Sequence, residues 1–289
     1  MKLGVVFPQT EIGADPSLIK DFAQTAESIG YDHMLCYDHV LGADPADRPD
    51  GWPAVFTHQA SFHEPLTLFA FLAGQTRTME FVTGVMVLPQ RQTVLVAKQA
   101  AEIDILSGGR LRLGVAIGWN TVEYESLGQS FSNRGRRIEE QIQLLRLLWS
   151  RELVDFQGTW HRIDRAGLNP QSIQRPIPIW MGGTANAAVN RVARIGDGWF
   201  PHFREEDDPS AIIADFRSRV NAAGRDADQV GMQIRLRMGA EDPDRWCREV
   251  AQWGRLGATH LAVNTMASGV ETPRGHLKAI ERFWSTIHS

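Results

Sequence analysis

Two adjacent residues, Asp38 and His39, are the first groups in the sequence that could do chemistry. They come directly after DHMLCY (32–37), an apolar stretch of strand length. Because an imidazole changes its charge between about pH 5 and 8, His39 could give a proton or a hydrogen bond to a bound ring. A loop histidine capped by its neighbouring carboxylate is the alternative, and position alone leaves both interpretations open.

A second group of chemical side chains follows RLRLGVAI (110–117), which also has the length of a strand. Gly118 and Trp119 come next, and Glu123 follows shortly after them. The sequence thus brings a small residue, an aromatic ring and a carboxylate to the end of one strand. Glu123 is therefore, together with His39, a candidate acid–base group.

Glycines mark two further places where a ligand could approach the backbone. Gly84 interrupts the apolar stretch EFVTGVMVL (80–88), which is typical of a bulge or of a close backbone approach, with a simple packing glycine as the alternative. The run MGGT (181–184) ends a strand and opens a helix, so free N–H groups and the helix dipole predict a phosphate seat. Many tight turns use the same glycine pair without a ligand.

Several aromatic and histidine residues could wall a pocket beside these groups. Trp52, His58 and His63 share the long segment 38–63, although loop packing explains each of them equally well. Trp199 is expected either to pack beside the phosphate seat or to be an ordinary core or rim aromatic.

These candidates are positioned by a regular alternation of strands and helices. Eight apolar stretches have strand length: 3–7, 32–37, 80–88, 110–117, 177–183, 197–201, 230–238 and 259–264. The stretches between them predict helices: 16–30, 64–77, 91–106, 132–150, 185–195, 208–223, 242–256 and 273–287. This alternation closes most simply into a (β/α)₈ TIM barrel, an α/β fold, so we expect one domain over residues 1–289. Barrel active sites lie at the C-terminal ends of the strands, where the candidate residues would meet.

Two segments interrupt the alternation. Residues 38–63 follow the second strand, and residues 152–175 contain LVDFQGTWHRI, which predicts a hairpin turning at Gly158. Insertions after barrel strands usually build the active-site face, so we expect insertions at the C-terminal face. The second segment could instead cover a barrel end.

Composition excludes several other classes of protein. The net charge of -4 and the pI near 6.1 provide no general basic surface, so nucleic acid is not an expected partner. The two cysteines, Cys36 and Cys247, have no C-x-x-C spacing, so neither a disulfide framework nor a metal site is predicted. The N-terminal apolar run is too short for a signal peptide, and no stretch reaches the ~20 apolar residues of a membrane span. We therefore expect a cytoplasmic protein. Nucleotide-binding, zinc-protease and serine-hydrolase motifs are absent from the sequence.

Residues 80–120, read together, resemble the luciferase-like monooxygenase superfamily, and more closely its branch of F420-dependent oxidoreductases. The matching elements here and further along the chain are Leu88-Pro89 with Arg91, Ala97-Lys98, Ala101 with Asp104, Leu106-Ser107 with Arg110, Gly118-Trp119 with Glu123, Arg134 with Arg137 and Glu140, PIPIWMGGT (176–184) and ARIGDGW (193–199). Their order and spacing agree with the eight strands counted independently.

The resemblance implies a homodimeric (β/α)₈ barrel that holds FMN or the deazaflavin F420 at its C-terminal face. Matched by position, Gly84 and Val85 correspond to a non-prolyl cis peptide that supports the ring, and His39 to a histidine that contacts the deazaflavin. The cofactor-binding residues that the resemblance implies are Asp38, His39, Gly84, Val85, Met86, Ile117, Gly118, Trp119, Met181, Gly182, Gly183, Thr184 and Trp199. Trp119 stands where some F420 dehydrogenases carry Glu, which leaves His39 and Glu123 as the expected catalytic residues.

The resemblance therefore predicts an oxidoreductase that transfers a hydride between F420 and a small organic substrate. The alternative is an FMN-dependent monooxygenase that uses reduced flavin and O₂ and is served by a separate reductase. A third interpretation is a flavin-binding protein without catalysis, in which Trp52, His58, His63, Glu123 and His202 would be dispensable. The identity of the substrate depends on how the two inserted segments fold.

Overall fold

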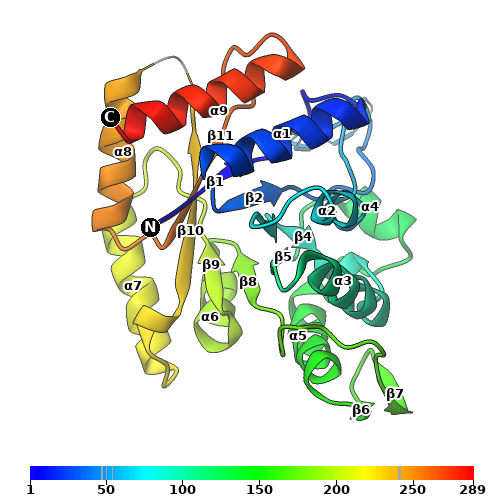
Figure 1. Cartoon of the computed structure of the whole chain (residues 1–289). Coiled ribbons are helices and arrows are strands. Elements are labelled where there is room, and N and C mark those ends of the chain that lie inside the picture. The colour runs from blue at the N-terminus through cyan, green and yellow to red at the C-terminus, as the bar shows by residue number, and fades with distance from the viewer. Residues whose placement is uncertain (47, 50, 54, 240–241) are drawn as a thin grey trace.

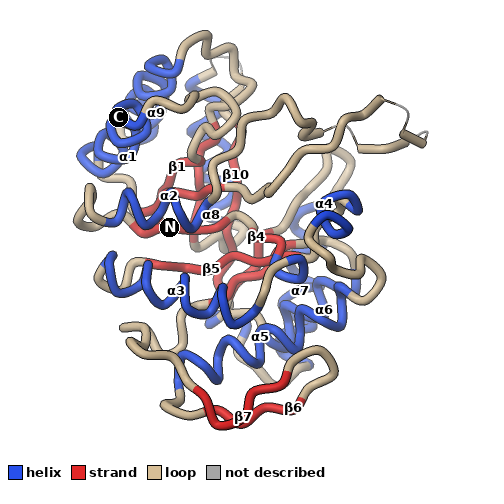
Figure 2. Tube along the Cα trace, turned by 90° about the vertical axis from the view of Figure 1, so that its right-hand side faces the viewer, coloured by secondary structure: helices blue, strands red, loops and turns tan. Residues whose placement is uncertain are grey.

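Parallel strands alternate with helices along the chain and close into a ring (Figures 1 and 2). The computed structural model describes residues 1–46, 48–49, 51–53, 55–239 and 242–289. The ring strands are β1 (Lys2–Val6), β2 (His33–Cys36), β3 (Glu80–Thr83), β4 (Met86–Val87), β5 (Leu111–Ala116), β8 (Ile179–Gly182), β9 (Gly198–Phe200), β10 (Gly231–Arg237) and β11 (His260–Asn264). They pair in the order β3-β2-β1-β11-β10-β9-β8-β5-β4, and β3 also pairs with β5. Because β3 and β4 share one place, the ring has eight positions, and the predicted TIM barrel is confirmed.

Helices surround the barrel in nearly the predicted ranges. They are α1 (Pro16–Ile29), α2 (Pro65–Ala73), α3 (Thr93–Ser107), α4 (Thr121–Ser126), α5 (Arg134–Ser150), α6 (Asn186–Ile195), α7 (Pro209–Ala222), α8 (Pro243–Arg255) and α9 (Pro273–Ile287), with single 3₁₀ turns at Leu88–Gln90 and Ala227–Gln229. The short helix α4 follows β5 and is an addition to the predicted set. None of the described helices is long and apolar enough to cross a membrane.

Local sequence signals decide where many of these helices begin. The helices α1, α2, α7, α8 and α9 all have proline in the first turn, where no intrahelical donor is needed. Each is preceded by a side chain that accepts a backbone N–H of that turn: Asp15, Glu64, Asp208, Asp242 and Thr272. Such caps contribute about 1 kcal/mol each, so the helix starts are encoded locally.

The barrel interior is apolar in its middle and charged at the N-terminal ends of its strands. Val6, Leu35, Val82 and Phe200 pack there with neighbouring apolar residues. At the N-terminal ends the Arg112 guanidinium donates to Glu80 Oε2 at 2.9 Å and lies 4.2 Å from the centre of the Trp180 ring. Burial, and next the charge of Arg112, lower the pKa of His260 to about 3 and that of His33 well below its usual value.

The predicted hairpin is present but packs on the outer helices. Its strands β6 (Val154–Gln157) and β7 (Arg162–Ala166) pair antiparallel, and Gly158 lies in the turn between them. Glu140 of α5 accepts the backbone N–H groups of residues 159, 160 and 161, and the His161 ring meets Thr93 of α3 at 2.6 Å. Segment 152–175 therefore thickens the outer layer, whereas segment 38–63 follows β2 at the C-terminal ends of the strands. Residues 47, 50 and 54 of that segment lie outside the described residues.

Gly114 allows two strands and the aromatic side chain of Phe200 to meet inside the barrel, below its mouth. Gly114 exchanges two hydrogen bonds with the Thr83 hydroxyl, of 2.7 and 2.8 Å. A β-carbon at this position would overlap the Thr83 carbonyl oxygen and come within 2.8 Å of the Phe200 ring. Any larger residue would therefore push β3, β5 and β9 apart.

We predict that Gly114→Ala lowers the free energy of unfolding by about 3 kcal/mol, because backbone atoms must move to admit the methyl group. The matched control is Gly254→Ala in α8, where an added β-carbon meets nothing within 4 Å and alanine favours the helix by about 0.5–1 kcal/mol. Urea unfolding of both variants measures the difference. A loss below about 1 kcal/mol in the Gly114 variant would contradict the proposed close approach.

Candidate functional site

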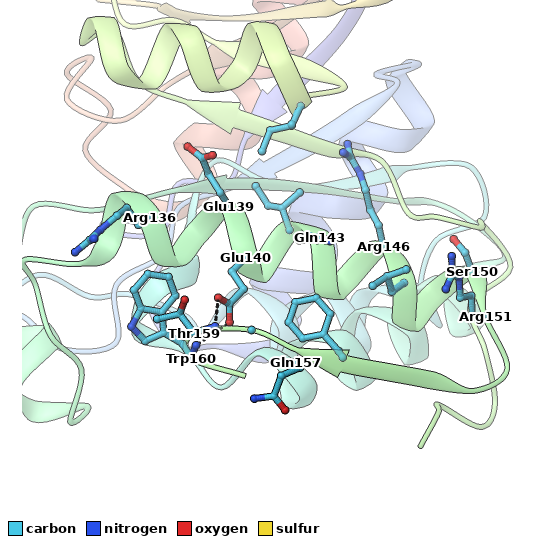
Figure 3. A pocket seen from close by; sticks show the side chains of 15 residues that line it. Arg136, Glu139, Glu140, Gln143, Arg146, Ser150, Arg151, Gln157, Thr159 and Trp160 are labelled. Atoms are coloured by element: carbon cyan, nitrogen blue, oxygen red, sulfur yellow. Dashed lines mark hydrogen bonds between the residues drawn. The ribbon is translucent and has the colours of Figure 1, made fainter. Parts of the chain in front are cut away.

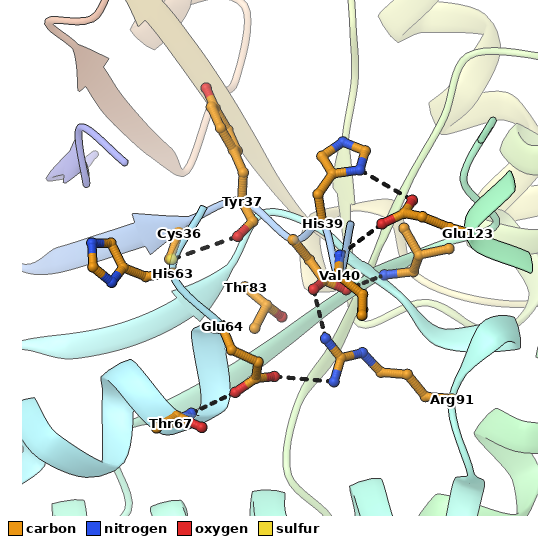
Figure 4. A network of polar contacts seen from close by, with 12 residues as sticks. Cys36, Tyr37, His39, Val40, His63, Glu64, Thr67, Thr83, Arg91 and Glu123 are labelled. Carbon is orange, nitrogen blue, oxygen red and sulfur yellow. Dashed lines mark hydrogen bonds and ion pairs between the residues drawn. The ribbon is translucent and has the colours of Figure 1, made fainter. Parts of the chain in front are cut away.

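The carboxyl ends of β2 and β5 bring His39 and Glu123 together, as their sequence positions predict. His39 Nδ1 lies 3.1 Å from Glu123 Oε2 (Figure 4). Glu123 Oε1 accepts the backbone N–H groups of Val40 at 2.6 Å and Leu41 at 3.2 Å. The glutamate side chain is 1% exposed and the histidine side chain 10%. The buried carboxylate thus accepts hydrogen bonds from three donors and has almost no contact with solvent.

This geometry gives the two residues different roles. Because a carboxylate accepts hydrogen bonds, Nδ1 of His39 carries the hydrogen and Nε2, on the opposite side of the ring, is left to accept or release a proton. Glu123 is held by α4, whose first turn is capped by the Asn120 side chain. The Glu123 carboxylate therefore fixes the orientation of the His39 ring.

Aromatic rings from the long loop and from the end of β5 enclose His39. The ring centroids of Phe56, Phe62 and Trp119 lie 5.1, 5.0 and 5.9 Å from that of the histidine. Trp52 packs edge-on against Trp119 at 6.3 Å. Segment 38–63 therefore folds over the site, as predicted, and lines it with aromatic rings.

One histidine of the same segment does not join this group. His63 packs on Phe7, and its Nε2 lies 3.0 Å from the Gly13 carbonyl oxygen, on the α1 side of the loop. His58 is exposed. The place predicted for His63 in the pocket wall is wrong, because the loop turns this side chain toward α1. The place predicted for the exposed His58 stays a prediction. Phe56 and Phe62, which the sequence interpretation overlooked, line the site instead.

The side chain of Asp38 points away from His39. Its two oxygens accept the backbone N–H of Val87 at 2.9 Å and an Arg91 N–H at 2.6 Å. Arg91 also donates to Glu64 at 3.0 Å (Figure 4). Burial opposes the charge of Arg91, but Asp38 and Glu64 outweigh it, so the arginine pKa is raised. Both carboxylate oxygens of this fully buried side chain are occupied. Asp38 is better described as tying β2 to β4 than as the direct cofactor contact that was predicted.

The peptide bond between Gly84 and Val85 is cis, as the resemblance implies. It joins β3 to β4, and the Gly84 N–H donates to the Cys36 carbonyl at 2.7 Å. A β-carbon on Gly182 would lie 3.3 Å from Val85 and 3.5 Å from Ala116, so three strand ends meet through small groups. Together these three residues form the floor of the barrel mouth. The Met86 and Met181 side chains are buried in the outer core, so only their backbone could contribute to this floor.

The predicted phosphate loop has free backbone donors at the start of α6, and a buried tryptophan holds the loop through a hydrogen bond. Gly183 has φ of +130°, and helix α6 begins after it without a side-chain cap. Thr184 is exposed. Trp199 has no exposed surface and donates its indole N–H to the Gly183 carbonyl at 2.8 Å. The direct cofactor contact predicted for Trp199 is therefore replaced by support of the loop.

The end of β5 also requires a glycine. Gly118 has φ of +63°, and an added β-carbon would lie 2.5 Å from a Val87 methyl group. The Ile117 carbonyl accepts the Tyr124 hydroxyl at 2.6 Å, which fixes the half-buried Ile117 beside it. These contacts place Trp119 against His39.

The sequence interpretation missed four polar residues at the barrel mouth. A cavity of about 290 Å³ is lined by His202, which was a candidate, and by Tyr37, Arg235, Arg237 and Asn264. The alternation in QIRLR at 233–237 was the available signal, because it places two cations on one face of a strand.

A larger cavity, of about 870 Å³, lies outside the barrel between α5 and the hairpin (Figure 3). Its charged groups are mostly paired: Glu139 with Arg191 and Arg194, Arg146 with Asp197, and Glu140 with the hairpin backbone. The barrel mouth, where His39 and the glycine-rich strand ends converge, is the better candidate for chemistry.

Comparison with known proteins agrees with this architecture. A family model described as luciferase-like monooxygenase matches residues 1–281. The chain belongs to this family. An uncharacterized protein of Mycobacterium tuberculosis is 34% identical over 224 residues, 76% of this chain and 77% of the relative. The FMNH₂-dependent dimethylsulfone monooxygenase of Pseudomonas putida is 28% identical over 256 residues, 87% of this chain and 66% of the relative.

A solved structure shares the fold at lower sequence identity. The F420-dependent secondary alcohol dehydrogenase, solved with an F420–acetone adduct, has a TM-score of 0.79 and 16% identity. The match covers 100% of this chain and 99% of the other. This likeness shows the same barrel fold.

We predict that Glu123→Gln lowers the free energy of unfolding by about 1–3 kcal/mol, because an amide cannot accept from all three donors and leaves one unpaired. The substitution also removes the acceptor that holds His39 in its Nδ1–H tautomer. ¹⁵N-resolved NMR of the imidazole detects the change of tautomer. Glu125→Gln, on the exposed face of the same helix, is the control and should change neither quantity. An unchanged His39 tautomer in the Glu123 variant would refute the positioning role.

Proposed function

We propose that this protein is an oxidoreductase that transfers a hydride between the deazaflavin F420 and a small organic carbonyl, alcohol or activated double bond. The observation that carries the proposal is His39, held by a buried carboxylate in an aromatic enclosure at the barrel mouth. The resemblance of residues 80–120 to the F420-dependent branch supports the choice of cofactor. When bound, F420 supplies two-electron hydride chemistry.

The residues at the mouth suit a planar tricyclic ring. Gly182, Ala116 and Val85 offer a floor without bulky side chains, and Trp119 offers an aromatic wall. The free N–H groups at the start of α6, beside Gly183, would hold the cofactor phosphate. These residues would thus provide a surface under the cofactor ring, an aromatic side chain beside it and a binding site for its phosphate, at the ends of different strands.

His39 would handle the proton that accompanies the hydride. When an alcohol is oxidised, the hydride leaves the carbon and a proton leaves the oxygen, and Nε2 of His39 is free to accept that proton. Glu123 stabilises the imidazolium that forms, because its carboxylate lies 3.1 Å from Nδ1. In the reverse direction the same nitrogen gives the proton back to a carbonyl oxygen. The aromatic rings around the histidine limit the access of competing water.

An FMN-dependent monooxygenase is the second candidate. The relative named for FMNH₂ is similar in sequence over 87% of this chain, which favours this alternative. Such an enzyme uses O₂ and receives reduced flavin from a separate reductase. The same floor and phosphate seat would serve it, so the cofactor itself separates the two proposals.

Equilibrium binding of F420 and FMN to the purified protein at matched salt tests the proposal directly. We expect tight binding of F420 and weak binding of FMN. The absorbance or fluorescence of the cofactor ring reports the binding. Tight FMN binding with no F420 binding, together with oxygen consumption on reduced FMN, would establish the second candidate instead. Binding of neither would refute both.

We predict that His39→Ala lowers turnover by about 10²–10⁴-fold, the usual contribution of a general acid or base, with a much smaller change in melting temperature. His58→Ala in the same loop is the control, since the His58 side chain is exposed. Turnover and thermal unfolding are measured for both. Equal turnover of wild type and the His39 variant would remove the histidine from the reaction.

A further inference from the structure

The cavity of about 290 Å³ at the barrel mouth is lined by two cations, Arg235 and Arg237. Arg235 and Arg237 project from β10, and neither has a carboxylate within ion-pair distance among the residues that the structure describes. Arg235 is half-buried. Its nearest partners are the Nδ1 of His202 at 3.4 Å and the face of the Tyr37 ring at 5.7 Å. Both are weak partners for a guanidinium that has lost part of its hydration.

Several buried or half-buried arginines of this chain pair with a carboxylate, whereas the half-buried Arg110 and Arg225 donate to backbone carbonyl groups instead. Arg112 meets Glu80 at 2.9 Å, Arg91 meets Asp38 at 2.6 Å, and Arg191 meets Glu139 at 3.1 Å. Partly desolvated charge is costly unless it is compensated, so an unpaired guanidinium facing a cavity points to a missing anion. The five N–H donors of arginine are arranged to bind a carboxylate or a phosphate through two bonds.

The surroundings of Arg235 reinforce a site for negative charge. Burial, followed by the charges of Arg235 and Arg237, lowers the pKa of His202, while Asp207 acts in the opposite direction. His202 therefore stays neutral and does not add a third cation. Asn264 contributes an amide that already contacts the Tyr37 hydroxyl at 3.4 Å. Phe203 and Trp253 stack at 5.3 Å and form an apolar wall of the same cavity.

We propose that this cavity binds the anionic group of the substrate, so that the enzyme acts on a small organic acid with an apolar body. The assignment rests on the proposed oxidoreductase function for the reaction, but the binding site itself does not depend on the cofactor. Tyr37 lines the cavity and comes two residues before His39, so an acid anchored here lies beside the segment that carries the acid–base group. Gly183 and the start of α6, on a different strand end, remain the seat for the cofactor phosphate.

Calorimetric titration of the purified protein with benzoate and with its uncharged analogue benzamide tests the site. We expect benzoate to bind roughly tenfold or more tightly than benzamide, because only the anion pairs with the guanidinium. Arg235→Gln should weaken benzoate binding by roughly tenfold or more, and Arg235→Lys should restore part of it. The control Arg248→Gln removes the same charge from the exposed face of α8 and should leave binding unchanged. Equal affinities for the two probes, or an Arg235→Gln variant that keeps its fold by circular dichroism and binds benzoate like wild type, would overturn the proposal.

A second set of titrations separates a substrate anion from a cofactor phosphate. If Arg235 holds the substrate, Arg235→Gln leaves the affinities for F420 and FMN unchanged. If it holds the cofactor phosphate, the variant loses affinity for FMN but not for riboflavin, which lacks the phosphate, and the substrate assignment is overturned. Failure of F420 and FMN to bind wild-type protein would refute the proposed function, whereas the comparison of benzoate with benzamide would still decide the anion site.

Discussion

The buried ion pair between Asp38 and Arg91 is the constraint on which the geometry of the site depends. A carboxylate inside a protein must have its oxygens satisfied, and here a guanidinium and the Val87 N–H complete it. This links the end of β2 to β4, directly beyond the cis peptide between Gly84 and Val85. With Asp38 held on one side of the chain, the next side chain, His39, is turned to the other side, toward Glu123. The direction of the histidine is therefore a consequence of how its neighbour is buried.

Glycines and small side chains determine the shape of the barrel mouth. Gly114 lets Thr83 and Phe200 approach within the barrel, and Gly118 lets β5 turn against Val87. Gly182 leaves the floor near Val85 open. Since each position either meets neighbouring atoms or has a positive φ, a larger side chain would fill the space or displace a strand. The close approach of these strand ends thus depends on absent side chains, and rings of the long loop enclose His39 nearby.

Charge is distributed unevenly along the barrel axis. At the N-terminal ends of the strands Arg112 is neutralised by Glu80 and packs on Trp180, which suits a closed structural end. At the mouth Arg235 and Arg237 of β10 are left without such partners among the described residues. Strand β10 therefore contributes Gln233, which accepts from Arg112 in the packed interior, and two arginines at the electropositive mouth.

The sequence by itself determined the eight-strand alternation, most helix starts, the hairpin at Gly158 and the family, because periodicity, proline, capping side chains and ordered motifs act over short distances. It also indicated His39 and Glu123 as candidate catalytic residues. Only the tertiary structure decided which way each side chain points. It turned Asp38 inward, placed Trp199 behind Gly183, sent His63 toward α1 and joined Phe56 and Phe62 to the site. These outcomes depend on contacts between residues far apart in the chain, where the satisfaction of buried polar groups and the packing of rings outweigh any local preference.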